Sequence, residues 1–238
     1  MPWPSRRFYP WHHPRFLWQN RGYGDFEDYL ASFSAGQRRN IRRERQAVAD
    51  QQISVVPCAG EEAPLRYFER MYEFYLRTNA KFGPWGCRYL TEAFFDGLAK
   101  TCRRHLLFMA AHENGAGSDP VAMALLLAKG GGLWGRYWGA DRSIHALHFE
   151  VCYYRPMAWA IEKGILRFDP GMGGDHKLRR GFAVSPAVSL HRFFDPRLQR
   201  VFALSMDEIN RLEDQRMNAM NRMAPLSRQK WQNTFLEP

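Results

Sequence analysis

The sequence predicts an α/β fold in which helices flank a central mixed, mostly antiparallel sheet. Residues 106–139 contain three apolar strands separated by a polar loop and by Gly130-Gly131-Gly132, and such short connections are typical of an antiparallel meander. Apolar residues then recur at helical spacing over 147–163, and a further strand follows at 165–169. This strand–helix–strand order predicts a crossover connection that joins two parallel strands.

Local signals place the remaining elements. Acidic residues at 25–28 favour the start of a helix, and Ser34 can cap a second one. Pro156 is expected to kink the crossover helix, which Gly164 can terminate. The predicted elements are, in order, helices at 25–33 and 35–52, a strand at 53–57, helices at 61–82 and 91–104, strands at 106–111, 121–128 and 133–139, a helix at 147–163, strands at 165–169 and 187–194, and a helix at 197–223.

This pattern divides the chain into an arm, one domain and a tail. Residues 1–24 are rich in Trp, Pro, His and Arg without periodicity, so we expect an irregular arm there. Residues 25–223 are expected to form a single domain, and the polar residues 224–238 a mobile tail. Within the domain we expect a basic helical entry at 25–52, a sheet core at 53–195 and a closing helix at 196–223.

The composition limits the class of protein. Hydrophobic residues make up 45% and aromatic residues 15%, which is typical of a globular chain. The longest apolar run, 121–128, is far shorter than the roughly 20 residues that span a membrane. The N-terminal residues have arginines but no apolar core, so no secretory signal is predicted and a cytoplasmic location is favoured. Four cysteines without a C-x-x-C pair favour reduced thiols over a disulfide framework or a zinc site.

The charge of the chain favours an anionic partner. The formal net charge is +10, which suits nucleic acid, a phosphorylated substrate or a membrane surface. The predicted helix at 35–52 concentrates this charge, with Arg39 and Arg43 one turn apart and only Glu44 nearby to neutralise it. One interpretation is a solvated helix face, and the other is an anion-binding helix in which Arg39 and Arg43 bind RNA or a diphosphate.

The order of elements is similar to the GNAT acyltransferase fold, in which an acyl donor enters where the fourth and fifth strands splay apart. Five blocks narrow this resemblance, namely WQNRGYGDFEDYL (18–30), NIRRERQAV (40–48), GRYWG (135–139), LHFEVCYY (147–154) and GGDHKLRRGF (173–182). Together they resemble the bacterial predicted N-acyltransferases of the peptidoglycan biosynthesis or recognition (FemAB-like) family, which are relatives of the FemABX aminoacyl transferases.

The resemblance implies an N-acyltransferase that moves an acyl or aminoacyl group onto an amine, such as that of a peptidoglycan precursor. It covers the C-terminal half of the family, which implies that a missing N-terminal half or a second copy in a homo-oligomer completes the cleft. The chain departs from the family at Pro156, where an ordinary helix former is usual, and at Asp175, where Glu is more frequent.

The acyl donor is either aminoacyl-tRNA or acyl-CoA. Ordinary GNAT enzymes hold the coenzyme A pyrophosphate on a glycine-rich loop before the crossover helix. The corresponding residues 140–148 have no glycine, and the carboxylates of Asp141 and Glu150 would repel a pyrophosphate, so coenzyme A is disfavoured. The FemABX relatives take aminoacyl-tRNA, and a basic chain fits tRNA as a partner.

Acyl transfer to an amine needs a base for the ammonium, a donor for the oxyanion and an acid for the leaving group. Carboxylates and imidazoles can accept the proton, and tyrosine or lysine can donate one. The candidate catalytic residues are Glu150, Asp175, His176, His148 and Tyr153. The candidate substrate-binding residues are Tyr137, Lys177, Arg180, Arg39 and Arg43.

Structural roles compete with these assignments. Glu150 lies three and four residues before Tyr153 and Tyr154, so a structural carboxylate bonded to tyrosine is an equal alternative. His148 could be a core histidine and Tyr137 a packed strand residue. The Asp175-His176-Lys177 loop is a poor core segment, so we expect it to contact a ligand.

Two further functions stay open. The chain could be a non-catalytic basic module that binds RNA or anionic cell-wall intermediates, or an acetyl-CoA-dependent acetyltransferase. We predict no metal site, because the spacing of His145, His148 and Glu150 is not that of a zinc site and places them on different faces of a helix.

Overall fold

The computed structural model describes residues 8–113, 115 and 118–225. The chain divides into two units. The larger comprises Trp18–Gly171 of the described chain, and the smaller comprises the residues up to Leu17 together with Met172–Pro225. Residues 25–223, which we expect to form one domain, contribute to both units.

The larger unit is built on a mixed sheet. Its strands are β2 (Ile53–Ala59), β3 (Leu106–Glu113), β4 (Ala122–Lys129), β5 (Gly132–Ala140), β6 (Arg167–Asp169) and the end of β1 (Tyr9–Gln19). They are hydrogen-bonded in the order β2-β3-β4-β5-β6-β1. β5 and β6 are parallel and the other neighbours are antiparallel, so the predicted meander and crossover are confirmed.

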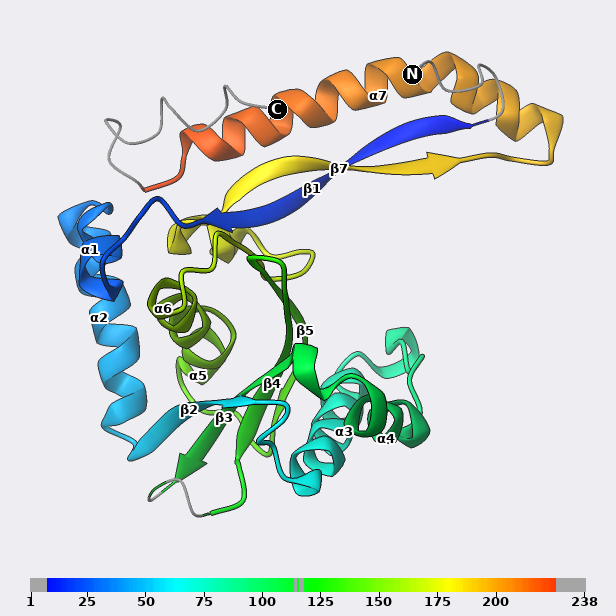
Figure 1. Ribbon diagram of the computed structural model, residues 1–238. Helices are drawn as coiled ribbons and strands as arrows, with labels where there is room; N and C mark the ends of the chain where they lie inside the picture. Colours follow the sequence, from blue (N-terminus) through cyan, green and yellow to red (C-terminus); the bar gives the residue numbers. More distant parts are fainter. Residues whose placement is uncertain (1–7, 114, 116–117, 226–238) are drawn as a thin grey trace. The chain divides into compact units, whose positions relative to one another are not determined.

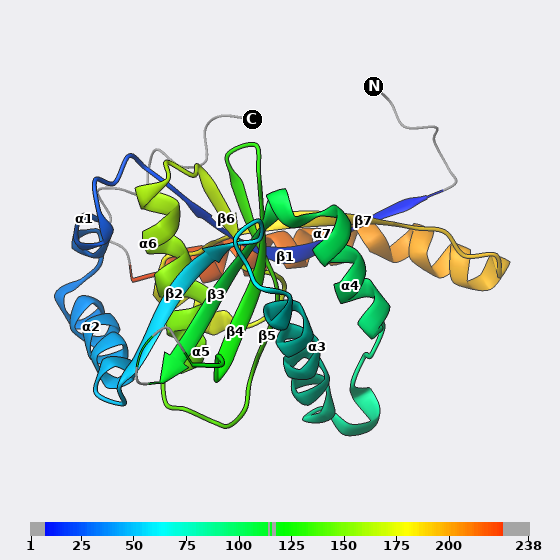
Figure 2. The ribbon, with the colours of Figure 1, turned by 60° about the horizontal axis from the view of Figure 1, so that its bottom comes forward.

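Helices cover both faces of this sheet. α3 (Leu65–Ala80) and α4 (Glu92–Thr101) lie on one face, and α1 (Phe26–Ala31) and α2 (Ala35–Ala49) lie beside the crossover helices on the other (Figures 1 and 2). Since both faces are covered, Leu106 to His112 of the central strand β3 are all buried. Gly139 allows α3 to approach β5, because a Cβ there would lie 2.4 Å from the Phe74 carbonyl oxygen.

The crossover is not one kinked helix. It consists of α5 (Leu147–Phe149), a π-helical turn (Glu150–Tyr154) and α6 (Arg155–Glu162). Pro156 lies in the first turn of α6, and the wider turn directly precedes it. Because proline has no N–H for the carbonyl four residues earlier, the regular ladder is interrupted there. Gly164, with a φ of 63°, follows the end of α6 as predicted.

The smaller unit is a two-stranded ribbon that packs against one long helix. Residues Tyr9–Leu17 of β1 pair antiparallel with β7 (Ala183–His191), and α7 spans Pro196–Arg222. The Asn210 side chain accepts a hydrogen bond from the His12 backbone N–H and donates one to the Pro10 carbonyl oxygen, both at 2.9 Å. This amide therefore ties α7 to the ribbon.

The strand β1 corrects the expectation of an irregular arm over Tyr9–Gln19. Residues 1–7 of that arm, and residues 226–238 of the predicted tail, lie outside the described residues. The prolines in β1 prevented its prediction as a strand. Proline is normally absent from the central strands of a sheet, because it has no N–H to donate to the neighbouring strand. Pro14 lies opposite Pro186. Pro10 lies four residues before Pro14, which is an even number, so both occupy the same type of position in the ladder. Successive antiparallel positions alternate between bonded and non-bonded pairs, so all three prolines can occupy positions at which no ladder N–H is required. The predicted strand at 187–194 accordingly begins earlier, at Ala183.

Among residues 8–225, leaving aside 114, 116 and 117, no helix combines the length and apolar character that a membrane crossing requires.

Candidate active site

The sheet of the larger unit opens between β5 and β6. These two parallel strands pair only over Gly132–Trp134, although β5 continues to Ala140. A pocket of about 80 Å³ lies where they diverge. Its lining includes Gly135, Arg136, Tyr137 and Trp138 from β5, His148, Cys152 and Tyr153 from the crossover, and Pro170 after β6. We call this the splay pocket.

A β-bulge shapes the wall of the splay pocket. Leu125 of β4 lies opposite Tyr137, and Leu126 lies opposite Gly135, so Arg136 has no partner on β4. In a regular strand Arg136 and Tyr137 would point to opposite faces. Both residues line the pocket, but the Tyr137 ring packs toward α3 and α4, with its centroid 5.4 Å from that of Tyr75 and 6.2 Å from that of Phe95.

Aromatic rings surround the imidazole in the splay pocket. The ring centroid of His148 lies 4.5 Å from that of Trp138 and 5.3 Å from that of Tyr153. Tyr153 is 3% exposed. Burial raises the pKa of Tyr137, and nearby Tyr75 adds to this while Arg136 opposes it. Tyr137 therefore keeps its proton at neutral pH and can donate a hydrogen bond.

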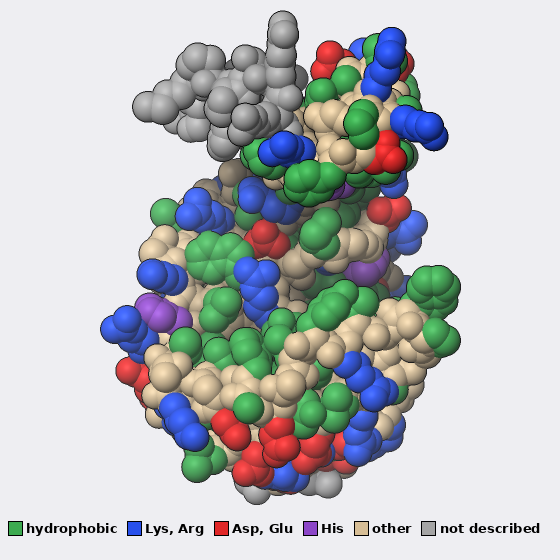
Figure 3. All heavy atoms as spheres, turned by 90° about the vertical axis from the view of Figure 1, so that its right-hand side faces the viewer, with side chains coloured by type: hydrophobic (Ala, Val, Ile, Leu, Met, Phe, Trp, Pro, Cys, Tyr) green, Lys and Arg blue, Asp and Glu red, His purple; other side chains and the backbone are tan. Residues whose placement is uncertain are grey.

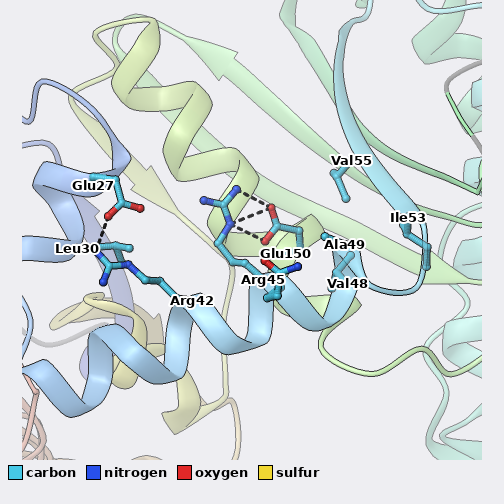
Figure 4. Close-up of a pocket in the computed structure, with 10 residues that line it drawn as sticks. Glu27, Leu30, Arg42, Arg45, Val48, Ala49, Ile53, Val55 and Glu150 are labelled. Atoms are coloured by element: carbon cyan, nitrogen blue, oxygen red, sulfur yellow. Dashed lines mark hydrogen bonds and ion pairs between the residues drawn. The ribbon is translucent and has the colours of Figure 1, made fainter.

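Glu150 lies in a different pocket. This pocket has a volume of about 400 Å³, lies along α2, and is lined by Glu27, Leu30, Arg42, Arg45, Gln46, Val48, Ala49, Ile53, Val55 and Glu150 (Figure 4). We call it the α2 pocket. The Glu150 carboxylate accepts hydrogen bonds from Arg45 Nε to Oε2 and from Arg45 Nη2 to Oε1, both at 3.0 Å. Glu150 is 6% exposed, and burial raises the pKa of its carboxyl group although Arg45 opposes the shift.

The partner of Glu150 is therefore an arginine rather than a tyrosine. Tyr154, which the sequence offers as a partner of Glu150, donates its hydroxyl hydrogen to Glu44 instead. Arg45 lies 105 residues from Glu150 in the sequence, so local spacing gave no sign of the pair.

The arginines of α2 are neutralised more than the sequence indicates. Arg42 Nη2 lies 2.6 Å from Glu27 Oε2, and Arg45 pairs with Glu150. The expectation that only Glu44 neutralises this helix is wrong, because both acids come from other elements. Arg39 and Arg43 are exposed, and Arg43 donates to Asn40 at 2.7 Å.

The carboxylates near the crossover are also paired. Asp141 lies 2.6 Å from Arg70 and 3.2 Å from Arg77, measured between side-chain oxygen and nitrogen. With Glu150 held by Arg45, neither acid presents an uncompensated charge. The charge argument against coenzyme A therefore does not hold in the folded chain.

The remaining predicted residues gather in the smaller unit, in a 3₁₀ turn at Asp175–Arg180. Lys177 and Arg180 are 3% and 4% exposed. Lys177 Nζ donates to the Met172 carbonyl oxygen at 3.1 Å and lies 5.3 Å from the centroid of the Phe16 ring. Arg180 Nη1 donates to the His176 carbonyl oxygen at 2.9 Å. The turn is therefore more buried than its ionisable residues indicate, and hydrogen bonds to backbone carbonyl oxygens satisfy its buried cations.

His176 packs against the glycines of this turn. A Cβ on Gly174, whose φ is 86°, would lie 2.3 Å from His176 Cε1. Burial lowers the pKa of His176, with Arg180 and Lys177 adding to this and Asp175 opposing it. The His176 imidazole is therefore neutral at physiological pH and able to accept a proton.

The structure thus separates the predicted residues into groups. Tyr137, His148 and Tyr153 share the splay pocket, whereas Glu150 lines the α2 pocket. The smaller unit holds Asp175, His176, Lys177 and Arg180, and the exposed surface of α2 holds Arg39 and Arg43.

Arg136 and Cys152 are the two unpredicted residues of the splay pocket whose side chains carry an ionisable group. Arg136 was missed because strand alternation places it away from Tyr137, and only the two glycines around RYW signalled an irregular strand. Cys152 lies four residues after His148, a spacing that places both on one helix face and could have identified it. Within the described ranges, no group of three or more His, Cys, Asp or Glu side chains is arranged to hold a metal ion.

Solved structures share this fold at low sequence identity. L-PGS from Bacillus licheniformis matches with a TM-score of 0.54 and 11% identity, over 93% of this chain and 68% of its own. The C-terminal domain (DUF2156) of a predicted lysylphosphatidylglycerol synthetase from Agrobacterium fabrum matches with a TM-score of 0.56 and 11% identity, over 83% of this chain and 66% of its own.

A conserved protein of unknown function from Bacteroides thetaiotaomicron VPI-5482 matches at 14% identity and a TM-score of 0.48, over 74% of this chain and 58% of its own. The chain therefore spans 58% to 68% of the length of these three structures. No curated protein matches it.

The architecture is a GNAT-like acyltransferase fold, with a mixed, mostly antiparallel sheet flanked by helices. The model of the FemAB-like family, described as peptidoglycan biosynthesis/recognition, matches residues 3–228. The chain belongs to this FemAB-like family.

Proposed function

We propose that the protein is an N-acyltransferase that transfers an acyl or aminoacyl group to an amine in the splay pocket. The observation that carries this proposal is the contact of His148 with Tyr153 and Trp138 in the pocket where the parallel strands diverge. Membership of the FemAB-like family supports the reaction class.

The residues of the splay pocket can supply each part of the reaction. The amine nitrogen attacks the carbonyl carbon of the donor, and His148 accepts the proton that the amine loses. The bond to the leaving oxygen or sulfur then breaks, and Tyr153, whose ring centroid lies 5.3 Å from that of His148, donates a proton to that atom. Because a bulged residue is left out of the ladder, the backbone N–H of Arg136 is the candidate donor to the oxyanion.

The donor is aminoacyl-tRNA or acyl-CoA, and we favour aminoacyl-tRNA. The net charge is +10, and Lys and Arg side chains are spread between hydrophobic ones over the face in Figure 3. Arg39 and Arg43 are exposed on α2, which lies on the side turned away from the viewer in Figure 3, and they too suit a phosphate backbone. The same two arginines support the alternative function, a basic module that binds RNA or anionic cell-wall intermediates without catalysis.

The acceptor is proposed to be an amine of a peptidoglycan precursor, as the description of the family suggests. Phosphatidylglycerol, which offers a hydroxyl and no amine, belongs in the same test as the alternative acceptor, because one structural neighbour is named as a lysylphosphatidylglycerol synthetase. Transfer to it alone would show ester formation and contradict transfer to an amine. The roles of Glu150, Asp175 and His176 in catalysis stay proposals that the same assay can decide.

The test is product formation from radiolabelled glycyl-, alanyl- or lysyl-tRNA, or acetyl-CoA, with each acceptor. His148→Gln should lower the rate of transfer by about 100-fold or more, as expected for loss of a general base. His105→Gln is the matched control, since His105 is half-buried outside both pockets. Tyr153→Phe should slow transfer, whereas Tyr72→Phe, which changes a half-buried tyrosine on α3, should not.

Three other results would contradict the proposal. Transfer that persists in His148→Gln at the wild-type rate would remove the splay pocket as the reaction site. Loss of transfer in Glu150→Gln but not in His148→Gln would assign the base to Glu150. Salt-dependent tRNA binding without transfer to either acceptor, from any of the donors, would favour the non-catalytic module.

A further inference from the structure

The α2 pocket has the size of a small-ligand site. Its volume of about 400 Å³ lies within the range of roughly 300 to 1,000 Å³ that such sites occupy. α2, β2 and the π-helical turn form its walls (Figure 4). The splay pocket uses other residues, so the α2 pocket is a separate feature of the larger unit.

Its charges are balanced and ordered. Glu27 and Arg42 lie at one end, and Arg45 with Glu150 lie in the middle (Figure 4). The outer pair is open to solvent, with 63% and 56% of the Glu27 and Arg42 side chains exposed, whereas the Glu150 side chain is 8% exposed. Two cations and two carboxylates favour a ligand without net charge, because Glu27 and Glu150 would repel a dianion such as phosphate.

The two guanidinium groups can still donate hydrogen bonds. Arg45 uses Nε and Nη2 for Glu150, and its Nη1 has no acceptor among the described residues. Arg42 donates to Glu27 through Nη2. The two residues are three apart on one helix, and Figure 4 shows their side chains diverging, Arg42 toward Glu27 and Arg45 toward Glu150. A ligand carboxylate placed between the two guanidinium groups can accept hydrogen bonds from both.

The other end of the pocket is aliphatic. Val48 and Ile53 are 2% and 7% exposed and form this end with Val55 and Ala49 (Figure 4). A ligand that matches this order of charged and aliphatic surfaces along the pocket has both of its charges at one end and an apolar group at the other.

We propose that the α2 pocket binds a small zwitterion of the aliphatic α-amino acid class. The ligand carboxylate lies between Arg42 and Arg45, its ammonium lies against Glu27, and its side chain lies against Val48, Ile53 and Val55. The proposal does not depend on acyl transfer, because it concerns binding at residues outside the splay pocket.

The test is isothermal titration calorimetry of the whole chain with L-leucine and three analogues. L-Leucine should bind, and both N-acetyl-L-leucine and L-leucine amide should bind at least about tenfold more weakly, since each lacks one charge. Glycine should also bind more weakly, because it has no side chain for the aliphatic end. Absence of heat with leucine at millimolar concentration, or equal affinity for the two blocked forms and leucine, would overturn the proposal.

Variants locate the site. Arg42→Gln should weaken leucine binding by about tenfold or more. Arg211→Gln is the matched control, because Arg211 forms an equally exposed ion pair with Glu208 on α7, with 54% and 59% of the side chains exposed. Equal loss of binding in both variants would overturn the proposal, since it would show a general effect of charge.

A second measurement does not depend on variants. In a spectrum of isoleucine methyl groups, leucine should shift the signal of Ile53, which lines the pocket, and leave that of Ile209 on α7 unchanged. An unshifted Ile53 signal at saturating leucine would contradict the site.

Discussion

The two pockets of the larger unit share one short segment and differ in chemistry. His148, Cys152 and Tyr153 face a small pocket rich in aromatic rings, whereas Glu150 faces a larger pocket built from ion pairs. All four residues lie within the same few residues of the crossover. Positions two apart on a helix point in nearly opposite directions, so neighbours in the sequence serve different sites. Ionisable residues that cluster in the sequence therefore need not belong to one active site.

The largest expected effect comes from breaking the buried ion pair of the α2 pocket. Arg45→Met leaves the Glu150 carboxylate buried without its cation, so the free energy of unfolding should fall by about 3 kcal/mol. Urea denaturation at pH 7 measures this loss. A change below about 0.5 kcal/mol would show that the pair is as weak as an exposed one.

The pH dependence of the free energy of unfolding tests the burial of Glu150 in a second way. Since burial raises the pKa of Glu150 in the folded chain, the native state holds its proton at pH values where the unfolded chain has lost it. The contribution of Glu150 to stability is then full below its unfolded pKa, near 4.3, and is lost as pH rises through the folded pKa. Glu150→Gln lacks this dependence.

The measurement is the stability of Glu150→Gln relative to wild type by urea denaturation at several pH values. The variant should gain relative stability as pH rises through this window. A relative stability that stays constant, or that moves the other way, would show that Arg45 outweighs burial.

The smallest expected effect concerns the exposed pair of the same pocket. Arg42→Gln should change the free energy of unfolding by less than about 0.5 kcal/mol, because both side chains of its ion pair are more than half exposed. Thermal denaturation at low and high salt measures it. A loss as large as that of Arg45→Met would show that the exposed and the buried ion pair of this pocket contribute equally to stability.

The sequence predicted the parts of the fold that local patterns determine. The meander followed from apolar strands separated by glycines, and the crossover followed from helical spacing before a further strand. β1 was missed because its prolines break the strand pattern and its partner β7 lies at the other end of the chain. The π-helical turn was missed because Pro156 signals only that a helix is interrupted, not how.

The candidate site was predictable in part for the same reason. Tyr137, His148 and Tyr153 stood out in two aromatic blocks, and all three line the splay pocket, although the Tyr137 ring packs on Tyr75. The pairing of Arg45 with Glu150 joins positions 105 residues apart, and no local pattern encodes it. Arg136 was missed because the β-bulge that leaves it without a partner depends on the pairing of β4 with β5.

One measurement tests the division of roles between the pockets most directly, namely the rate of acyl transfer and the affinity for leucine in the same His148→Gln protein. The two pockets share no lining residue, so the substitution should act on one of them alone. We predict that transfer slows by about 100-fold while the Kd for leucine stays within about twofold of wild type. Wild-type transfer, or loss of leucine binding together with transfer, would contradict this account.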